Sequence, residues 1–340
     1  MGYTCFWAGA AVEWTINMAN MRDVSEESGV SLASVSRILA EDPNFQVRDE
    51  TRKRVLDAAR KLGYRNSARA RTGAKIGCLL SFTAEAYSDK YFMTILSAVN
   101  RDLQNAGCSL SPMYAAGDIT KIDKMLKAES LSGLILFDDT LSEHDFVRLR
   151  TAVPCIVGVD TDYQGVDNVG HDEFRTGILA VEHLIARGHK RIAYIGGDEG
   201  SLHSRRYAYL NIMNRHGLTA PPDYLMDCGW DPDKCHDLIL KLCSGENRPT
   251  AIFAGSDNLA IAVLSAIHEL GMEAPGDVAV VGVNDLDFTA FTSPTLTTVS
   301  IPMEDIGSAA ADLLLRRING YTGIPIRILF PTTLIIRQST

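Results

Sequence analysis

Carboxylate, amide and hydroxyl side chains stand directly after apolar runs of the sequence, where they could bind a polar ligand. They are Asp160 and Asp162 after residues 154–159, Ser256, Asp257 and Asn258 after 250–254, and Asn284 and Asp285 after 278–283. Arg205 adds a guanidinium fork, and Tyr91, Phe92, Trp230 and Phe291 add aromatic surface. Carboxylates and amides can bridge the hydroxyls of a neutral sugar, and an aromatic ring can cover its apolar face. The sequence therefore contains the side chains of a sugar site.

Each of these groups also has a structural interpretation. Asp257 and Asp285 can cap the helices that follow them. Trp230 can belong to the core, and the Tyr91-Phe92 pair can pack on the protein surface. Arg205 can be a solvated residue at the start of a helix. The sequence leaves these alternatives open.

A second set of residues, near the N-terminus, could contact DNA. It comprises Ser31, Leu32, Ala33, Ser34, Ser36 and Arg37. Serine hydroxyls can donate to phosphates, small apolar groups can touch thymine methyls, and an arginine can reach the O6 and N7 atoms of guanine. Residues 18–75 contain 12 Lys and Arg against 8 Asp and Glu, a net charge of +4 in a chain of net charge −9. This distribution favours DNA binding over the alternative, a helical hairpin with a solvated face.

Short helices must position this second set. A first helix is predicted over residues 22–29, with Gly29 as its left-handed stop. A second is predicted over residues 30–39, with Ser31 as its N-cap. A third, over residues 49–62, carries apolar residues at helical spacing. Two short helices joined by a tight turn and closed by a third form a helix-turn-helix domain.

From residue 75 onward, strand-like and helix-like runs alternate, which is typical of parallel sheets. Strands are predicted over 75–82, 109–114, 132–137, 154–159, 190–195, 250–254, 278–283 and 296–300. Helices are predicted over 91–107, 118–129, 142–152, 172–187, 201–216, 231–244, 256–271 and 302–319. About 260 residues exceed one such sheet and suit two lobes of five or six strands each. Because ligands bind beyond the carboxyl ends of parallel strands, we expect the polar residues to face a cleft between the lobes.

Several other classes of protein are disfavoured by the sequence. The chain lacks the P-loop, H-E-x-x-H and G-x-S-x-G motifs, so we predict no enzyme and no cofactor. Its seven cysteines contain no C-x-x-C pair, so we expect free thiols in a reducing cytoplasm and no metal site. No apolar run of about 18 residues is free of charge, which disfavours a membrane span. Residues 1–17 lack Lys and Arg, so they are predicted to be a non-native or disordered extension rather than a signal peptide.

Longer segments of the sequence resemble a known family. MANMRDVSEESGVSLASVSRIL and VRDETRKRVLDAARKLGYR resemble the DNA-binding head of the lactose/galactose repressor family. GILAVEHLIARGHKRIAYIGG, AIFAGSDNLAIAVLSAIHELG, VAVVGVNDLDFTAF and the ending LFPTTLIIRQST are similar to the family's periplasmic-binding-protein-like core. Within the family, the sequence most resembles the galactose/evolved-β-galactosidase repressor branch. The resemblance implies an N-terminal all-α helix-turn-helix head followed by a two-lobed α/β core.

The resemblance also implies roles for single residues. In the head, it implies that Leu32 and Ala33 read bases, that Arg37 reads a guanine and that Ser31 contacts the DNA backbone. In the core, the positions expected to contact an effector are Asp160, Arg205, Ser256 and Asn284. Trp230, Phe291, Tyr91 and Phe92 complete the predicted effector site as aromatic walls.

The segment between head and core departs from the family pattern. Residues 65–75 are strongly basic, and Arg69 and Arg71 are expected to contact DNA. In the family, this segment folds into a short helix on the operator and inserts a leucine into the minor groove. This chain has no leucine between Leu62 and Leu79. An arginine can enter a narrow minor groove instead, and a flexible, solvated linker is the alternative.

These patterns predict a domain organisation. Residues 1–17 are the extension, 18–64 the helix-turn-helix head, 65–75 the hinge and 76–340 the core for effector binding and dimerisation. The family's chain crosses between its lobes three times, which places crossings near Asp160, Phe291 and Tyr321. One lobe is therefore predicted over about 76–160 and 292–321, and the other over about 161–291 and 322–340.

The predicted function is a sugar-responsive transcriptional regulator, a repressor of carbohydrate (galactoside-type) utilisation genes. It is expected to bind a pseudo-palindromic operator as a homodimer in the cytoplasm, away from membranes. A sugar or galactoside effector in the interlobe cleft is expected to release it. The alternative is a solute-binding protein of a sugar transporter, which would share the core but have no use for residues 22–64. A regulator whose leucine-free hinge no longer supports DNA binding is a third possibility.

Overall fold

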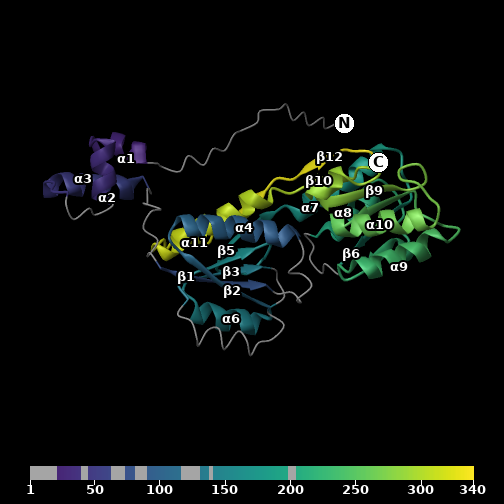
Figure 1. Cartoon of the computed structure of the whole chain (residues 1–340), viewed down its shortest axis with the longest axis horizontal. Helices are drawn as coiled ribbons and strands as arrows, with labels where there is room; N and C mark the ends of the chain where they lie inside the picture. The colour runs from purple at the N-terminus through teal and green to yellow at the C-terminus, as the bar shows by residue number, and fades with distance from the viewer. Residues whose placement is uncertain are drawn as a thin grey trace, which may run out of the picture. The chain divides into compact units, whose positions relative to one another are not determined.

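The structure is a computed structural model, and it describes residues 21–39, 45–62, 73–80, 90–115, 131–137, 141–197 and 204–340. The chain divides into two compact units, Met1–Ala70 and Arg71–Thr340 (Figure 1). The predictions for residues 1–17, for a helix over 118–129 and for the hinge residues Arg69 and Arg71 lie outside the described residues.

The first unit contains the three predicted helices, α1 (Met21–Ser28), α2 (Leu32–Leu39) and α3 (Asp49–Lys61). Their apolar faces enclose a small core of Val24, Val30, Val35, Ile38, Val55, Ala58 and Ala59. Gly29 ends α1 with a φ of 64°, which an L side chain would adopt only with strain. The hydroxyl of Ser31 caps α2 by accepting a hydrogen bond from the N–H of Ser34 at 3.3 Å. The three predicted helices and the turn between α1 and α2 are therefore confirmed.

A six-stranded sheet forms the first lobe of the second unit, in the order β11-β5-β4-β3-β1-β2, with every neighbour parallel. Its strands are β1 (Lys75–Leu80), β2 (Ser109–Ala115), β3 (Gly133–Phe137), β4 (Ile156–Val159), β5 (Asp167–His171) and β11 (Arg327–Phe330). Figure 1 shows α4 (Lys90–Asn105) and α11 (Met303–Ile318) on one face and α6 (Glu143–Ala152) on the other. Because helices cover both faces, β3, β4 and β5 are buried along their whole length.

A second six-stranded sheet forms the second lobe, in the order β12-β10-β9-β8-β6-β7. Its strands are β6 (Ile192–Gly196), β7 (Leu225–Asp227), β8 (Ala251–Ala254), β9 (Ala279–Asn284), β10 (Thr297–Ser300) and β12 (Thr333–Ile335), of which β12 runs antiparallel. Helices α7 (Glu173–Ala186) and α8 (Arg205–Arg215) pack together, as do α9 (Pro232–Cys243) and α10 (Asp257–Glu269). Two short 3₁₀ turns, η3 (Pro222–Tyr224) and η4 (Asp287–Ala290), complete this lobe.

The chain crosses between the lobes later than the sequence predicted. Crossings were expected near Asp160, Phe291 and Tyr321, but β5 and β11 belong to the first sheet whereas β10 belongs to the second. The crossings therefore follow His171, Ser300 and Phe330, and the predicted lobe boundaries at 160/161, 291/292 and 321/322 are wrong.

The physical reason is that β5 does not look like a buried strand. Its side chains include Asp167, Asn168 and His171, all buried because each has hydrogen-bonding partners inside the protein. Polar residues at three of five positions conceal the apolar pattern by which a central parallel strand is recognised. Strand β11 is half-exposed, and β12 has three residues, so the sequence carries a weak signal for both.

Six of the seven cysteines lie in the described part of the chain, and these six are free thiols. Cys78, in β1, illustrates their surroundings: burial raises the pKa of its thiol to about 12. None of the helices in the described residues has the length and apolarity that a membrane span requires.

Candidate functional site

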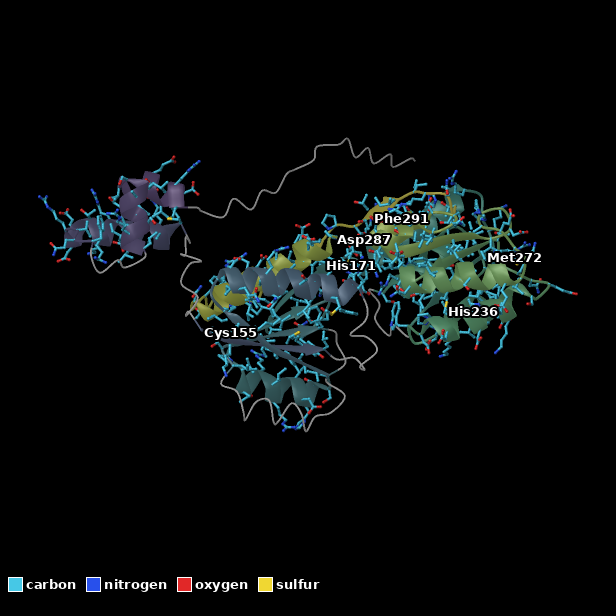
Figure 2. The ribbon with its side chains drawn as sticks, in the orientation of Figure 1. Cys155, His171, His236, Met272, Asp287 and Phe291 are labelled. Atoms are coloured by element: carbon cyan, nitrogen blue, oxygen red, sulfur yellow. The ribbon has the colours of Figure 1, made fainter. Side chains whose placement is uncertain are left out.

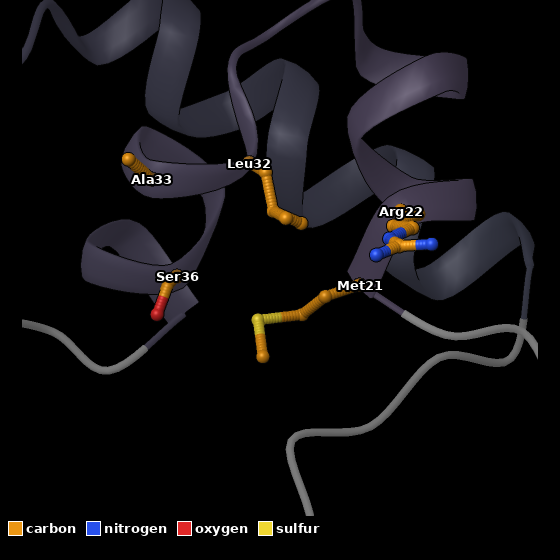
Figure 3. A pocket seen from close by; sticks show the side chains of 5 residues that line it. All are labelled: Met21, Arg22, Leu32, Ala33 and Ser36. Atoms are coloured by element: carbon orange, nitrogen blue, oxygen red, sulfur yellow. The ribbon is translucent and has the colours of Figure 1, made fainter.

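The exposed face of α2 gathers most of the residues predicted to contact DNA. Leu32, Ala33 and Ser36 open onto a shallow hollow that Met21 and Arg22 also line (Figure 3). Leu32 is 42% exposed although it is a large apolar residue, because Val35 and Ile38 supply the buried face of the same helix. An exposed apolar side chain next to Arg22 has the chemistry to contact base edges in a DNA major groove.

The other predicted DNA contacts in the described part of the chain are Ser31, Ser34 and Arg37. Ser31 and Ser34 share a hydroxyl–hydroxyl hydrogen bond of 2.9 Å at the start of α2. Arg37 is exposed, and its guanidinium carbon lies 5.4 Å from the centre of the Phe45 ring. This cation–π contact limits the rotamers of Arg37. Arg22 was not selected from the sequence, although its basic side chain in the predicted first helix was an available signal.

In the first lobe, three polar side chains meet where the strands end. Tyr91, on the first turn of α4, donates its hydroxyl hydrogen to the carboxylate of Asp160, which follows β4. The Nδ1 atom of His171, the last residue of β5, lies 3.2 Å from Asp160 Oδ1 and 3.3 Å from the Tyr91 oxygen. The backbone adapts to this cluster: Asp160 has a φ of 51°, and a Cβ on Gly170 would approach Asp160 Oδ1 to 2.5 Å.

The neighbours of Asp160 keep its carboxyl group ionised. Burial by itself raises the pKa of Asp160, but His171 and the hydrogen bond from Tyr91 outweigh burial and lower the pKa overall. Burial and the neighbouring Asp160 charge raise the pKa of Tyr91 well above its usual value. Asp160 is therefore a carboxylate and Tyr91 a neutral donor at physiological pH.

Phe92 contributes an apolar edge to the same end of the lobe. Its ring meets Tyr91 edge-on at 5.1 Å between centroids and Phe137, at the end of β3, at 6.0 Å. Tyr91 is buried, whereas Phe92 is partly exposed. The sequence left open whether this pair lines a site or packs on the lobe. The contacts with Tyr91 and Phe137 show that Phe92 packs on the lobe at least in part.

In the second lobe, Arg205 and Trp230 form a stacked pair beyond the carboxyl ends of the strands. The guanidinium carbon of Arg205 lies 4.9 Å from the centre of the Trp230 ring, and its Nη1 donates to the Gly255 carbonyl at 3.1 Å. Trp230 has a φ of 64° and is 39% exposed, so the core interpretation of this residue is wrong. A Cβ on Gly197 would lie 2.1 Å from the Trp230 Nε1, so the ring needs that glycine.

Arg205 also links the two lobes electrostatically. Its charge acts on both Tyr91 and Asp160, and its Nη2 lies 3.9 Å from Glu173 Oε1 at the start of α7. The side chain of Arg205 is 12% exposed, so it is not a solvated helix start. Arg205 is therefore close enough to act electrostatically on the Tyr91–Asp160 pair. We refer to Tyr91, Asp160, His171, Arg205 and Trp230 as the polar cluster.

The other predicted effector residues have mixed placements. Ser256 caps α10 by accepting from the N–H of Leu259 at 3.3 Å, and Asn284, with a φ of 116°, ends β9 with its side chain buried. Asp285 pairs with Arg337 at 2.6 Å rather than capping a helix. Phe291 is 86% exposed just beyond η4, so only its position near the strand ends favours a wall of the site (Figure 2).

Comparison with known proteins identifies the family. Residues 20–67 match the bacterial regulatory proteins of the lacI family, and residues 181–340 match a periplasmic binding protein-like domain. The HTH-type transcriptional repressor MelR of Bacillus subtilis (strain 168) is 31% identical over 341 residues, which cover 95% of this chain and 97% of MelR. The chain belongs to the LacI family of bacterial regulatory proteins. It is therefore a DNA-binding transcriptional regulator.

Two further similarities place the fold of this LacI-family regulator among known ones. The ribose operon repressor of Escherichia coli (strain K12) is 29% identical over 90% of this chain and 94% of that repressor. The solved structure of a transcriptional regulator CelR–cellobiose complex matches with a TM-score of 0.72 and 24% identity over 95% of this chain and all of that one. The predicted helix-turn-helix head and two-lobed α/β core are confirmed. These relatives are regulators rather than enzymes, and none is a galactose repressor.

Asp257 is a buried polar residue whose role the sequence left open. It does not cap α10, since Ser256 does; its carboxyl group accepts from the hydroxyl of Thr298 at 2.6 Å and from the N–H of Leu286 at 2.8 Å. Burial raises its pKa to about 7 from a usual value of 3.8. The folded protein thus holds this proton to a higher pH than the unfolded chain does. The resulting contribution to the stability of the LacI-family core is fully present below pH 3.8 and is lost as pH rises through 7.

A pH-dependent stability is therefore expected. Between pH 5.5 and pH 8, the wild-type protein should lose about 2 kcal/mol of unfolding free energy relative to Asp257→Asn, which cannot ionise. Asparagine keeps an oxygen that can accept from the Leu286 N–H. Urea denaturation of both proteins at the two pH values measures the difference, and histidines that titrate in this range act equally in both. An identical pH dependence of the two proteins would contradict the buried protonated carboxyl group.

Proposed function

We propose that this LacI-family regulator is a repressor of sugar-utilisation genes, controlled by a sugar that binds between its lobes. The observation that carries the proposal is the polar cluster formed by the Tyr91–Asp160 hydrogen bond and the Arg205–Trp230 stack. An ionised carboxylate, a guanidinium fork and a partly exposed indole are the groups that bind hydroxyls and the apolar face of a pyranose. The names of two relatives, MelR and the ribose operon repressor, both repressors, agree with it.

The effector class within this proposal is a galactoside. The resemblance of the core to the galactose-repressor branch supports it, and Asn284 in the effector set supplies a neutral amide for a hydroxyl. Ser256, Phe92 and Phe291 join the set as further contacts. Because operator DNA lies in the cytoplasm, the repressor acts there.

On DNA, the head uses the exposed face of α2. In this proposal Leu32 and Ala33 read bases, Arg37 reads a guanine, and serines 31, 34 and 36 contact phosphates. Arg69 and Arg71 contact the DNA from the hinge. Two chains related by a two-fold axis bind the two halves of a pseudo-palindromic operator, because a symmetric dimer presents two identical heads.

Effector binding couples to DNA through the angle between the lobes. The polar cluster draws Tyr91 and Asp160 from the first lobe and Arg205 and Trp230 from the second, so a ligand that contacts all four favours one angle. Lys90 and Asp287 join the lobes at the surface with an ion pair of 2.5 Å, which a change of angle would lengthen. A difference of a few kcal/mol in effector affinity between two angles is enough to shift the population of the DNA-binding form.

Operator binding tests the proposal directly. The full chain is titrated by fluorescence anisotropy against DNA from upstream of its own gene, with and without D-galactose, methyl β-D-galactoside, cellobiose and D-ribose. Binding that weakens steeply with salt and is released by one sugar is the expected result. DNA binding that none of these sugars changes would remove the sugar effector but keep the regulator. Release by cellobiose or ribose alone would replace the galactoside.

Arg37→Ala should weaken operator binding. We expect an affinity loss of about 10- to 100-fold, together with tolerance of other bases at one position of each half-site, because a bidentate arginine–guanine contact contributes about 1–3 kcal/mol. Anisotropy with the operator and with single-base variants measures both effects. Arg215→Ala, which removes an exposed arginine at the end of α8 in the core, is the matched control. A uniform loss over all sequences would show that Arg37 contacts phosphate instead.

A further inference from the structure

One buried nitrogen atom in the polar cluster has no hydrogen-bonding partner. His171 is buried, with 2% of its side chain exposed, and its Nε2 makes no hydrogen bond in the part of the chain that the structure describes. An imidazole nitrogen that loses water without gaining a partner destabilises the protein. Such an atom is satisfied by ordered water, by an ion or by a ligand.

The groups around His171 Nδ1 determine whether Nε2 is a hydrogen-bond donor or acceptor. Tyr91 already donates its only hydroxyl hydrogen to Asp160, so the two atoms near His171 Nδ1, the Asp160 Oδ1 and the Tyr91 oxygen, are both acceptors. Nδ1 must therefore carry the hydrogen. In the neutral ring, Nε2 is then left with a lone pair, and its missing partner is a hydrogen-bond donor.

The position of His171 places this acceptor beside the proposed effector residues. It is the last residue of β5, and the chain crosses into the second lobe immediately after it, where Asp172 caps α7. Figure 2 shows His171 at the end of the first lobe that faces the second. Its partners Tyr91 and Asp160 are the residues on which the Arg205 charge acts.

We propose that His171 is a specificity-determining residue of the effector site, where its Nε2 accepts a hydrogen bond from one hydroxyl group of the bound sugar. This inference rests on the proposed function. A site built to hydrogen-bond one hydroxyl discriminates strongly against an analogue that lacks it, because the buried acceptor is then left unpaired. Tyr91 and Asp160 act indirectly, because their contacts with Nδ1 fix the tautomer and the orientation of the imidazole ring.

Two substitutions separate this role from a structural one. Asparagine places its amide nitrogen near the position of Nδ1, so His171→Asn keeps a donor for Asp160 and removes the acceptor. Glutamine reaches the position of Nε2, so His171→Gln keeps an acceptor and gives up the link to Asp160. If His171 only holds the crossing between the lobes, His171→Asn should resemble the wild type more closely than His171→Gln.

Sugar binding to the full chain is measured by calorimetry, first with D-galactose, methyl β-D-galactoside, cellobiose and D-ribose. The tightest binder is then compared with its monodeoxy analogues, each lacking one hydroxyl. We expect one analogue to bind the wild type about tenfold or more weakly, and His171→Asn to bind the parent sugar about tenfold more weakly without discriminating against that analogue. His171→Gln should regain part of the discrimination.

Other outcomes overturn the inference. If His171→Asn ranks the analogues as the wild type does, Nε2 contacts no hydroxyl. If His171→Asn weakens the binding of the parent sugar and of every analogue by the same factor, His171 has a structural role. Should His171→Asn fail to fold, as judged by circular dichroism, the ranking by His171→Gln decides, since loss of all discrimination there also overturns the inference. If the wild-type protein binds none of the four sugars, the proposed sugar effector is wrong, and so is the proposed role of His171.

Discussion

Arg205→Ala is expected to weaken effector binding by a factor of about 30 to several thousand. Truncating one member of a buried, hydrogen-bonded charge cluster costs about 2–5 kcal/mol, and each 1.4 kcal/mol is tenfold. Arg205 fits this case because it is 12% exposed, stacks on Trp230 and donates to the Gly255 carbonyl. Its loss removes the guanidinium that would bind sugar hydroxyls, and it also removes the group on which the Trp230 ring stacks.

Arg205→Ala should change the response to sugar and leave DNA binding by the head unchanged. Operator affinity without sugar is expected to stay within about threefold of the wild-type value, whereas the sugar concentration needed for release rises with the loss of sugar affinity. Calorimetry with the releasing sugar and anisotropy with the operator measure the two quantities. Equal loss of operator affinity would mean that Arg205 mainly supports the fold.

Two neighbouring variants control this prediction. Arg206→Ala removes the next arginine of α8, which a helix directs about 100° away, and should change sugar affinity by less than about threefold. Arg205→Lys keeps the charge but loses the planar fork and the stack on Trp230, so it should recover only part of the affinity. If Arg206→Ala weakened sugar binding as much as Arg205→Ala, the effect would come from the net charge of the second lobe.

The local parts of the structure could be predicted from the sequence because their signals are local. Gly29 and Ser31 mark the turn between two helices by backbone and capping chemistry that involves only the next few residues. The eight predicted strands are apolar runs, and each is present within about two residues. Such signals need no knowledge of what packs against them.

The membership of the lobes and the polar cluster could not be predicted in this way. Strand β5 can hold a buried carboxylate because Asp167 meets Arg317, which lies 150 residues further along the chain. His171 was not selected because a single histidine in a polar run has no signal until Tyr91 and Asp160 are placed beside it. Asp257 and Asp285 were open to a capping role because the sequence does not show that Thr298 and Arg337 pair with them.

The pair of Asp167 and Arg317 also carries the largest expected effect on stability. Asp167 is 1% exposed at the start of β5, and it accepts from Arg317 Nε at 2.7 Å, from Arg317 Nη2 at 2.6 Å and from the N–H of Ile326 at 2.7 Å. Arg317 Nη1 donates to the Gly323 carbonyl at 2.6 Å, and its guanidinium stacks on Tyr321 at 4.7 Å. One guanidinium thus joins the end of α11, the start of β5 and the loop that leads into β11.

Arg317→Met should lower the free energy of unfolding by about 3–5 kcal/mol, because it leaves the Asp167 carboxylate buried without its counter-charge. Urea denaturation of the full chain measures the loss. Arg316→Ala, which also removes a guanidinium from the Tyr321 ring, at 4.9 Å, should cost less than about 1 kcal/mol. Adding Asp167→Val to Arg317→Met should recover part of the stability, because an apolar pair no longer leaves a charge buried. If the double variant is less stable than Arg317→Met, the Ile326 hydrogen bond outweighs the ion pair in holding β5 to the last crossing.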